Sequence, residues 1–210
     1  MQQPFHSDIG NSRAASFQVR KHLKGTGTDE DRRTFLTNLG LQLSSSIISD
    51  LESSNGERAL DLLNKTNQWS LNGKKLDIFS LSRLMQTANL IVGSASDNSG
   101  DHGLVVAAMF DFPTFTISHM AISCRVIGLG LEDAFLAQFR ISNTSYLKLD
   151  FLATERNNAT QAYLPGLHAS ENSEGELLIE LLRVPDHAQI SGIEFQKIVS
   201  PASDRLSKVG

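Results

Sequence analysis

Cysteine is almost absent from this sequence, and its scarcity excludes a fold stabilised by internal disulfides. Cys124 is the only cysteine among 210 residues, as is usual for proteins of the reducing cytoplasm. No grouping of cysteine and histidine has zinc-site spacing, so we expect no metal. The chain also lacks an apolar run of about 18 residues, and its polar N-terminus lacks the apolar core of a signal peptide. We therefore expect a cytoplasmic protein without a membrane span.

Positive charge is not in excess either. The chain has 19 Lys and Arg against 23 Asp and Glu, giving a formal net charge of -4, which argues against nucleic-acid binding. The hydrophobic share of 40% is ordinary for a globular protein, and 210 residues are enough for one sizeable core.

The apolar periodicity divides the chain into an N-terminal segment and one larger domain. Residues 12–24 have helical spacing and precede two glycines, so we expect 1–27 to be a helix and linker and 28–210 one domain. The patterns predict helices at 28–39, 57–69, 77–88, 131–141 and 157–164, and strands at 41–48, 89–96, 103–112, 115–124, 145–153, 176–184 and 190–200. Short turns predict antiparallel hairpins among the second to fourth strands, and we expect the last two strands to pair with each other.

Two details of the predicted helices can be checked directly. Ile78, Leu81, Leu84 and Met85 are expected to face inward. Pro165 and Gly166 are expected to stop the helix at 157–164. Together the predicted elements indicate an α/β fold.

A glycine-containing segment lies between the strand predicted at 115–124 and the helix predicted at 131–141. Its residues are Arg125, Val126, Ile127, Gly128, Leu129 and Gly130. Glycine permits a tight turn and a close approach of ligand to backbone, and the first amides of the next helix point into such a loop. These amides predict a site for a phosphate or an oxyanion. Alternatively, the two glycines simply end the strand.

This R-x-x-G-x-G pattern resembles the pyrophosphate loop of the GNAT acyltransferases, which bind acyl-CoA. Residues 157–164 resemble the GNAT segment in which an asparagine begins a short helix and an aromatic residue ends it. The resemblance implies that Asn157 contacts pantetheine and that Tyr163 protonates a departing thiolate. Alternatively, Asn157 caps the helix and Tyr163 packs its ring. The implied fold is GNAT-like, with a mixed, mostly antiparallel central sheet, flanking helices and an additional N-terminal helix.

Four motifs in order resemble a more specific family, the FkbH-like proteins. They are N-K-T-N-Q-W at 64–69, D-N-S-G-D-H-G-L-V at 97–105, S-C-R-V-I-G-L-G-L-E at 123–132 and A-T-E-R-N at 153–157. Proteins of this family join a haloacid-dehalogenase (HAD) domain to a GNAT-like domain. They are associated with transfer of a glyceryl group to an acyl carrier protein in polyketide biosynthesis.

The resemblance covers the GNAT-like part of that family, because no D-x-D-x-T motif lies near the start of this chain. It implies an acyl carrier protein as partner, a HAD-type phosphatase domain supplied elsewhere, and CoA or phosphopantetheine as the thioester carrier. Leu129 stands where the family usually has arginine, and the loss of that cation weakens the case for tight CoA binding.

Three further residues are candidates for catalysis. Cys124 ends a predicted strand and could accept an acyl group, although a free cysteine is more often buried by packing. His102 could act as a general base or simply occupy a turn. Glu132 could also act as a base, but its main predicted role is a favourable interaction with the helix dipole, because it lies in the first turn of a helix.

Uncharged polar residues indicate where a substrate would bind. They are Asn64, Thr66, Asn67 and Gln68. Their donors and acceptors suit a polyol or an amide, such as glycerate or pantetheine, or they bond to a neighbouring loop. Asp97 and Asp101 bracket a turn, where they would bind substrate hydroxyls or cap the hairpin.

These features favour an acyltransferase module that binds a pantetheine thioester and transfers a glyceryl or other acyl group to a carrier protein. A second hypothesis is a non-catalytic module that docks a carrier protein for a separate HAD domain. A third is an acetyl-CoA N-acetyltransferase.

Overall fold

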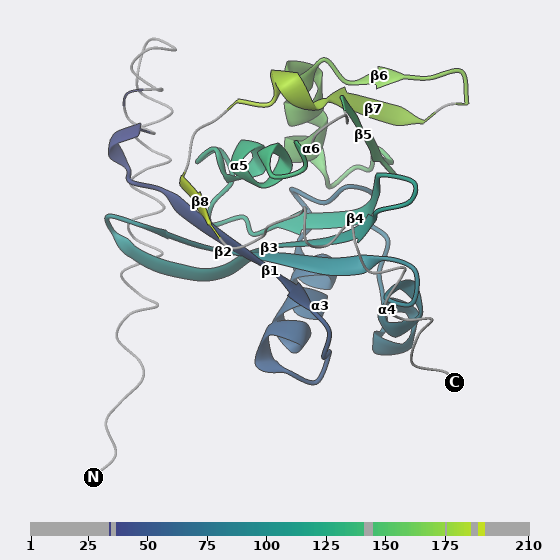
Figure 1. Ribbon diagram of the computed structural model, residues 1–210, viewed down its shortest axis with the longest axis horizontal. Helices are drawn as coiled ribbons and strands as arrows, with labels where there is room; N and C mark the ends of the chain where they lie inside the picture. The colour runs from purple at the N-terminus through teal and green to yellow at the C-terminus, as the bar shows by residue number, and fades with distance from the viewer. Residues whose placement is uncertain (1–33, 35–36, 141–144, 175, 186–188, 192–210) are drawn as a thin grey trace, which may run out of the picture.

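A computed structural model describes residues 34, 37–140, 145–174, 176–185 and 189–191 of the chain (Figure 1). The helix predicted at 12–24 and the linker at 25–27 lie outside the described residues. So does most of the helix predicted at 28–39 and of the strand predicted at 190–200.

The described strands form one mixed, mostly antiparallel sheet, which confirms the predicted α/β class. The strands are β1 (Gln42–Ile48), β2 (Asn89–Asp97), β3 (Gly100–Asp111), β4 (Thr116–Ile122), β5 (Tyr146–Leu149), β6 (Ser170–Glu171), β7 (Leu177–Glu180) and β8 (Gln189–Ser191). Their order in the sheet is β6-β7-β5-β4-β3-β2-β1-β8. Neighbours pair antiparallel except β4 with β5 and β1 with β8. The predicted hairpins from β2 to β4 are confirmed.

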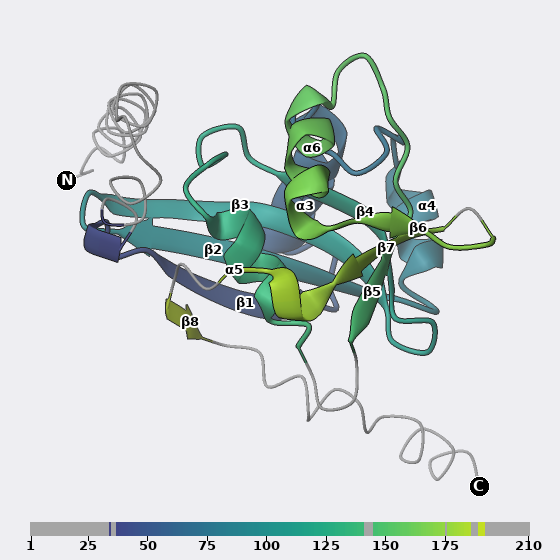
Figure 2. The same ribbon diagram turned by 90° about the horizontal axis from the view of Figure 1, so that it is seen from above.

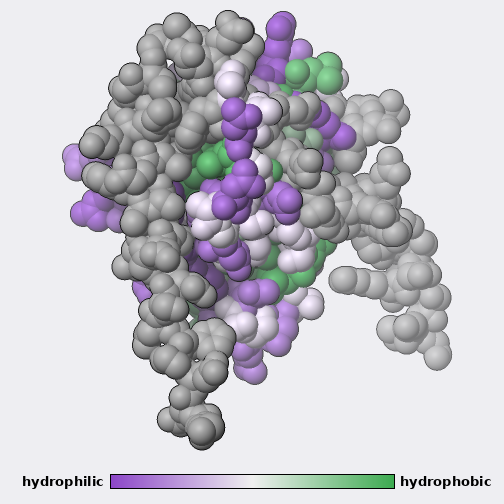
Figure 3. Space-filling model, turned by 90° about the vertical axis from the view of Figure 1, so that its left-hand side faces the viewer, coloured by the Kyte–Doolittle hydropathy of each residue, from purple (hydrophilic) through white to green (hydrophobic). Residues whose placement is uncertain are grey.

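Helices cover both faces of this sheet. They are α3 (Ser54–Lys65), α4 (Ile78–Leu84), α5 (Leu131–Ala137) and α6 (Asn158–Tyr163), with short 3-10 helices η1 (Leu164–Leu167) and η2 (Leu181–Arg183). Figures 1 and 2 show α3 and α4 on one face and α5 and α6 on the other. On the side shown in Figure 3, hydrophilic described residues are interspersed with smaller hydrophobic patches.

The helix α3 begins earlier and ends earlier than its apolar spacing predicts. Ser53 caps it, because its Oγ accepts a hydrogen bond from the Gly56 amide at 3.1 Å. Ala59 and Leu62 are buried against the sheet as expected. Trp69 is also buried, but it lies in a turn beyond the end of α3, and it belongs to the core cluster that contains Phe110 on the α5 face of the sheet.

Two clusters of buried side chains hold the layers together. On the α5 face, Phe110 packs edge-to-face on Phe139 with ring centroids 4.6 Å apart. On the α3 face, Leu62, Leu81 and Met109 belong to the second cluster. Ile78 does not join it and is 42% exposed, so the prediction that it faces inward is wrong. The helix α4 is shorter than predicted and presents fewer residues to the sheet.

The prediction that Pro165 and Gly166 stop the helix is confirmed, since α6 ends at Tyr163. The chain then continues as the 3-10 helix η1, because proline fits the first turn of a helical segment. The prediction that the last two strands pair with each other is wrong. The strand β7 pairs with β5 and β6, whereas β8 pairs with β1 at the opposite edge of the sheet. Alternating hydrophobicity identifies a strand but does not identify its partner.

Candidate functional site

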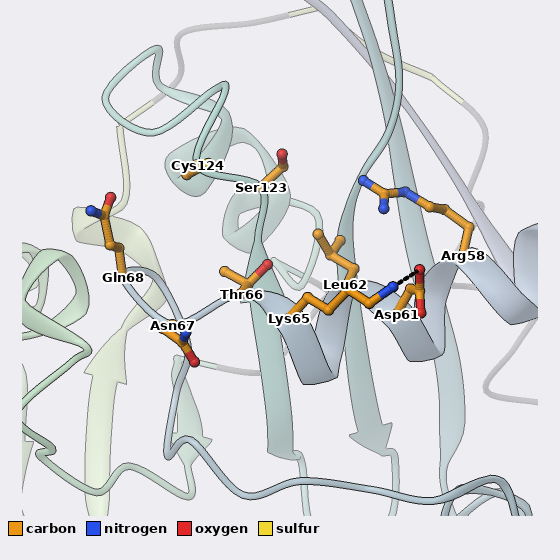
Figure 4. A pocket seen from close by; sticks show the side chains of 9 residues that line it. All are labelled: Arg58, Asp61, Leu62, Lys65, Thr66, Asn67, Gln68, Ser123 and Cys124. Carbon is orange, nitrogen blue, oxygen red and sulfur yellow. Dashed lines mark hydrogen bonds and ion pairs between the residues drawn. The ribbon is translucent and has the colours of Figure 1, made fainter.

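The candidate site is a pocket of about 470 Å³ between α3 and the end of β4 (Figure 4). Its lining residues are Arg58, Asp61, Leu62, Lys65, Thr66, Asn67 and Gln68 from α3 and the segment after it, with Ser123 and Cys124 from the end of β4. Positions 58, 61 and 65 are three and four residues apart, so they share one stripe of the helix. The pocket therefore lies between a polar helix stripe and the chain leaving the sheet.

Cys124 is exposed at this pocket. The strand β4 ends at Ile122, and the Ser123 amide then donates to the Val105 carbonyl oxygen at 2.8 Å. Cys124 comes after this last attachment to β3. The expectation that packing buries this cysteine is therefore wrong, and its thiol is accessible to a molecule in the pocket.

The polar motif predicted to bind substrate divides into a structural residue and lining residues. Both polar atoms of the Asn64 side chain bond to the backbone of Leu76, at 2.6 and 2.9 Å, so Asn64 anchors the neighbouring loop. Thr66, Asn67 and Gln68 line the pocket. Asn67 accepts a hydrogen bond from Lys75 at 3.3 Å and is exposed. These three residues offer uncharged donors and acceptors to a ligand.

A second pocket of about 420 Å³ lies beside the first and shares two of its residues. Asn67 and Gln68 line both, and Arg156, Asn158 and Ala159 complete the second. The polar motif after α3 thus separates two adjoining hollows, one reaching toward Cys124 and one toward the start of α6.

The glycine loop after β4 forms hydrogen bonds within the chain. The Gly128 amide donates to Glu132 Oε1 at 2.7 Å, and Glu132 is only 4% exposed. The Leu129 amide donates to the Val126 carbonyl oxygen at 3.2 Å. Gly128 has φ +82°, a conformation that favours glycine. The anion held by this loop is therefore the carboxylate of Glu132.

The sheet opens between β4 and β5, and the segment from Trp69 to Asn72 fills the opening. The Ile122 amide donates to the Trp69 carbonyl oxygen at 3.0 Å. On the same edge the Leu71 amide donates to Met120 at 2.9 Å, and on the β5 side the Leu152 amide donates to Leu71 at 3.2 Å. The chain itself therefore bonds to the backbone edge of β4.

Asn157 fastens this inserted segment. It is fully buried, and its Nδ2 donates to the carbonyl oxygens of Ser70 at 3.1 Å and Leu152 at 2.9 Å. Its Oδ1 accepts from the Thr154 amide at 2.8 Å and from Gln161 at 2.8 Å. Asn157 begins α6 but makes no side-chain capping bond. It lines neither of the two pockets described above.

Tyr163 lies at the end of α6 with its hydroxyl directed to a carboxylate. The hydroxyl donates to Asp133 Oδ1 at 2.6 Å, and the ring packs on Trp69 with centroids 5.5 Å apart. Burial raises the pKa of the Tyr163 hydroxyl well above its usual range, and the negative charge of Asp133 raises it further. In this arrangement the proton of Tyr163 is held by Asp133.

His102 and the two aspartates lie at the tip of the β2–β3 hairpin. His102 is 3% exposed and its Nε2 is 2.9 Å from Asp97 Oδ2. Burial opposes ionisation of Asp97, but hydrogen bonds from Ser99 and His102 outweigh it and lower the pKa of the carboxyl. Asp101 accepts from the Gly103 amide at 2.7 Å. The aspartates therefore cap the hairpin, and His102 is a buried residue of β3 rather than a turn residue.

Sequence reasoning missed Arg58, Ser123 and Arg156 as residues of the two hollows. The signal available for Arg58 was its position three residues before Asp61 and seven before Lys65, which places all three on one stripe of a predicted helix. No sequence pattern identified Arg156, because its proximity to Gln68 depends on how α6 packs against the rest of the fold.

Comparison of the chain with protein-family models, curated proteins and solved structures finds no match. Among the described residues, no helix is both long and apolar enough to cross a membrane.

Proposed function

We propose that this chain is an acyl-transfer module with a GNAT-like fold, of the FkbH-like type, that receives the acylated pantetheine arm of CoA or a carrier protein. The arm would enter the pocket between α3 and β4. The observation that carries the proposal is the exposed thiol of Cys124 in a pocket shared with Thr66, Asn67 and Gln68. A short glyceryl or related acyl group would bond to these uncharged side chains.

The order of elements supports the fold proposal. A glycine loop and the helix α5 connect the parallel strands β4 and β5, which separate where the segment from Trp69 to Asn72 begins. The position of the arm differs from the one that the GNAT resemblance implies, because the chain itself fills the space between these two strands.

In the proposed reaction Cys124 acts as the acyl acceptor. Its thiolate attacks the thioester carbonyl, a new carbon–sulfur bond forms at Cys124, and the pantetheine sulfur leaves as a thiolate. A second pantetheine thiolate would reverse this step and carry the acyl group away. No proton donor is required for the departing sulfur, so the engagement of Tyr163 with Asp133 does not block the reaction.

Intact-protein mass spectrometry tests the proposal. The chain is incubated with an acylated pantetheine, and peptide mapping locates any added acyl group. We expect a mass gain of one acyl group on the peptide that contains Cys124, and no gain in Cys124→Ala. Ser123→Ala is the matched control and should still be acylated. A wild-type protein that gains no mass, or gains it at another residue, would contradict the proposed chemistry.

The second candidate is a non-catalytic module that docks a carrier protein for a separate HAD-type phosphatase domain. It is favoured by the internal engagement of Glu132, Asn157 and Tyr163, which leaves none of these side chains directed to a ligand in the two pockets. Binding of acyl-pantetheine in the same pocket without any mass gain would support this candidate over the first.

A further inference from the structure

The cations of the pocket between α3 and β4 are not equivalent. Lys65 Nζ forms an ion pair with Asp61 Oδ2 at 2.7 Å. Arg58 is half-buried, and no hydrogen bond or ion pair joins its guanidinium to another residue within the described part of the chain. Figure 4 shows the Arg58 side chain reaching from α3 toward the side of the pocket that carries Ser123. Arg58 therefore presents an uncompensated positive charge to the pocket.

The charge balance of the pocket favours an anion at this position. Its lining includes two cations, Arg58 and Lys65, and one acid, Asp61, although the whole chain has a net charge of -4. A guanidinium has five donors in a planar fork, which matches the oxygens of a phosphate and binds two of them at once. Arg58 is thus suited to a phosphate ester more than to a single point charge.

The length of the α3 wall of the pocket can be estimated from the helix geometry. Lys65 follows Arg58 by seven residues, which at 1.5 Å per residue gives about 10 Å. Figure 4 shows Cys124 at the Thr66 end and Arg58 at the other. A phosphopantetheine arm has about thirteen bonds from sulfur to phosphorus, as many as roughly four extended residues, and so spans up to about 15 Å, which is long enough to reach along this wall from Arg58 to Cys124.

We infer that Arg58 binds the phosphate of a 4′-phosphopantetheine arm whose sulfur reaches Cys124. This inference rests on the proposed function and adds a specificity-determining residue to it. The paired Lys65 and Asp61 lie along the middle of the arm, where its amides and hydroxyl are uncharged. The phosphate is therefore recognised by a side chain of α3 and not by the glycine loop, whose Gly128 amide is bonded to Glu132.

Isothermal titration of the full chain with 4′-phosphopantetheine and with pantetheine tests the inference. Wild-type protein should bind the phosphorylated ligand about tenfold to a hundredfold more tightly. Arg58→Gln should bind the two ligands equally, with its affinity for pantetheine unchanged, and Arg58→Lys should keep part of the preference. Arg83→Gln removes an exposed arginine of α4 outside the pocket and should behave as wild type. Circular dichroism verifies that each variant is folded.

Equal binding of the two ligands by wild-type protein would overturn the role of Arg58 and leave the proposed function standing. Binding of neither ligand would overturn both. A preference that survives in Arg58→Gln would also overturn the inference. Titration with CoA identifies the source of the arm: binding as tight as that of phosphopantetheine indicates the free cofactor, and weaker binding indicates a carrier protein. Either result supports the contact between Arg58 and the phosphate, provided that Arg58→Gln weakens the binding of the phosphorylated ligand.

Discussion

At the residue scale, Asn157 shows how a side chain with a functional appearance can have a structural role. Its Nδ2 donates to the carbonyl oxygen of Ser70, which is 87 positions away in the sequence. The buried side-chain amide of Asn157 bonds to five backbone and side-chain groups, and its removal destabilises the fold because each group left unpaired loses a hydrogen bond. The bonds of Asn157 explain its place in the fold without a ligand.

Asn157→Ala should therefore lower the free energy of unfolding by about 2–4 kcal/mol. The adjacent Asn158 is exposed and makes one long hydrogen bond, to Glu155 at 3.4 Å, so Asn158→Ala should change stability by less than about 0.5 kcal/mol. Urea unfolding of both variants measures the difference. Equal free energies of unfolding for the two variants would show that the hydrogen bonds of Asn157 do not stabilise the fold.

A second residue-scale prediction concerns His119 and pH. Burial lowers the pKa of His119, and the charge of Lys74 lowers it further, whereas Asp150 acts in the opposite direction. The unfolded histidine takes up a proton near pH 6.5 and the folded one only at lower pH, so the unfolded state binds more protons in this window. Stability should therefore fall as the pH drops below about 6.5.

His119→Gln should flatten this fall, because glutamine does not titrate. Urea unfolding of wild type and variant between pH 5 and pH 8 gives the two slopes. If the stability of the variant falls as steeply as that of wild type, groups other than His119 cause the pH dependence and the prediction is wrong.

At the element scale, the segment from Trp69 to Asn72 determines whether a ligand can enter the space between β4 and β5. It bonds to both neighbouring strands and contains Trp69, which is 2% exposed. We expect the amides of Leu71 and Ile122 to exchange with deuterium as slowly as those of central β3. Hydrogen exchange followed by NMR measures this. Exchange of the Leu71 amide at the rate of an exposed loop would mean that the segment can leave and that the space is available to a ligand.

The helix α3 shows what apolar periodicity can and cannot predict. The stripe of Ala59 and Leu62 predicted that α3 would be a helix and which face it would bury. It also placed Trp69 on the helix, which is wrong, because spacing alone does not show where a helix ends: Trp69 lies in a turn after α3 and packs on the opposite face of the sheet. The polar stripe of α3 was visible in the sequence, but its proximity to Cys124 depends on the packing of α3 against β4.

At the scale of the whole molecule, the sequence predicted the class of the fold better than its pairing. Alternating and apolar runs located β1 to β5 and β7. They could not predict that β8 pairs with β1, because pairing between distant segments depends on how the whole sheet is laid out. For the same reason the motif residues Cys124 and Gln68 could be recognised separately, while the pocket that contains both could not.

The central claim is that this pocket receives a pantetheine arm with its sulfur at Cys124. The most direct test is the rate of disulfide exchange at Cys124 with the disulfide of pantetheine, compared with the disulfide of 2-mercaptoethanol. We predict that the pantetheine disulfide reacts about tenfold faster or more, since binding along α3 positions its sulfur. We also predict that Gln68→Ala reduces this advantage. Equal rates for the two disulfides would contradict the account.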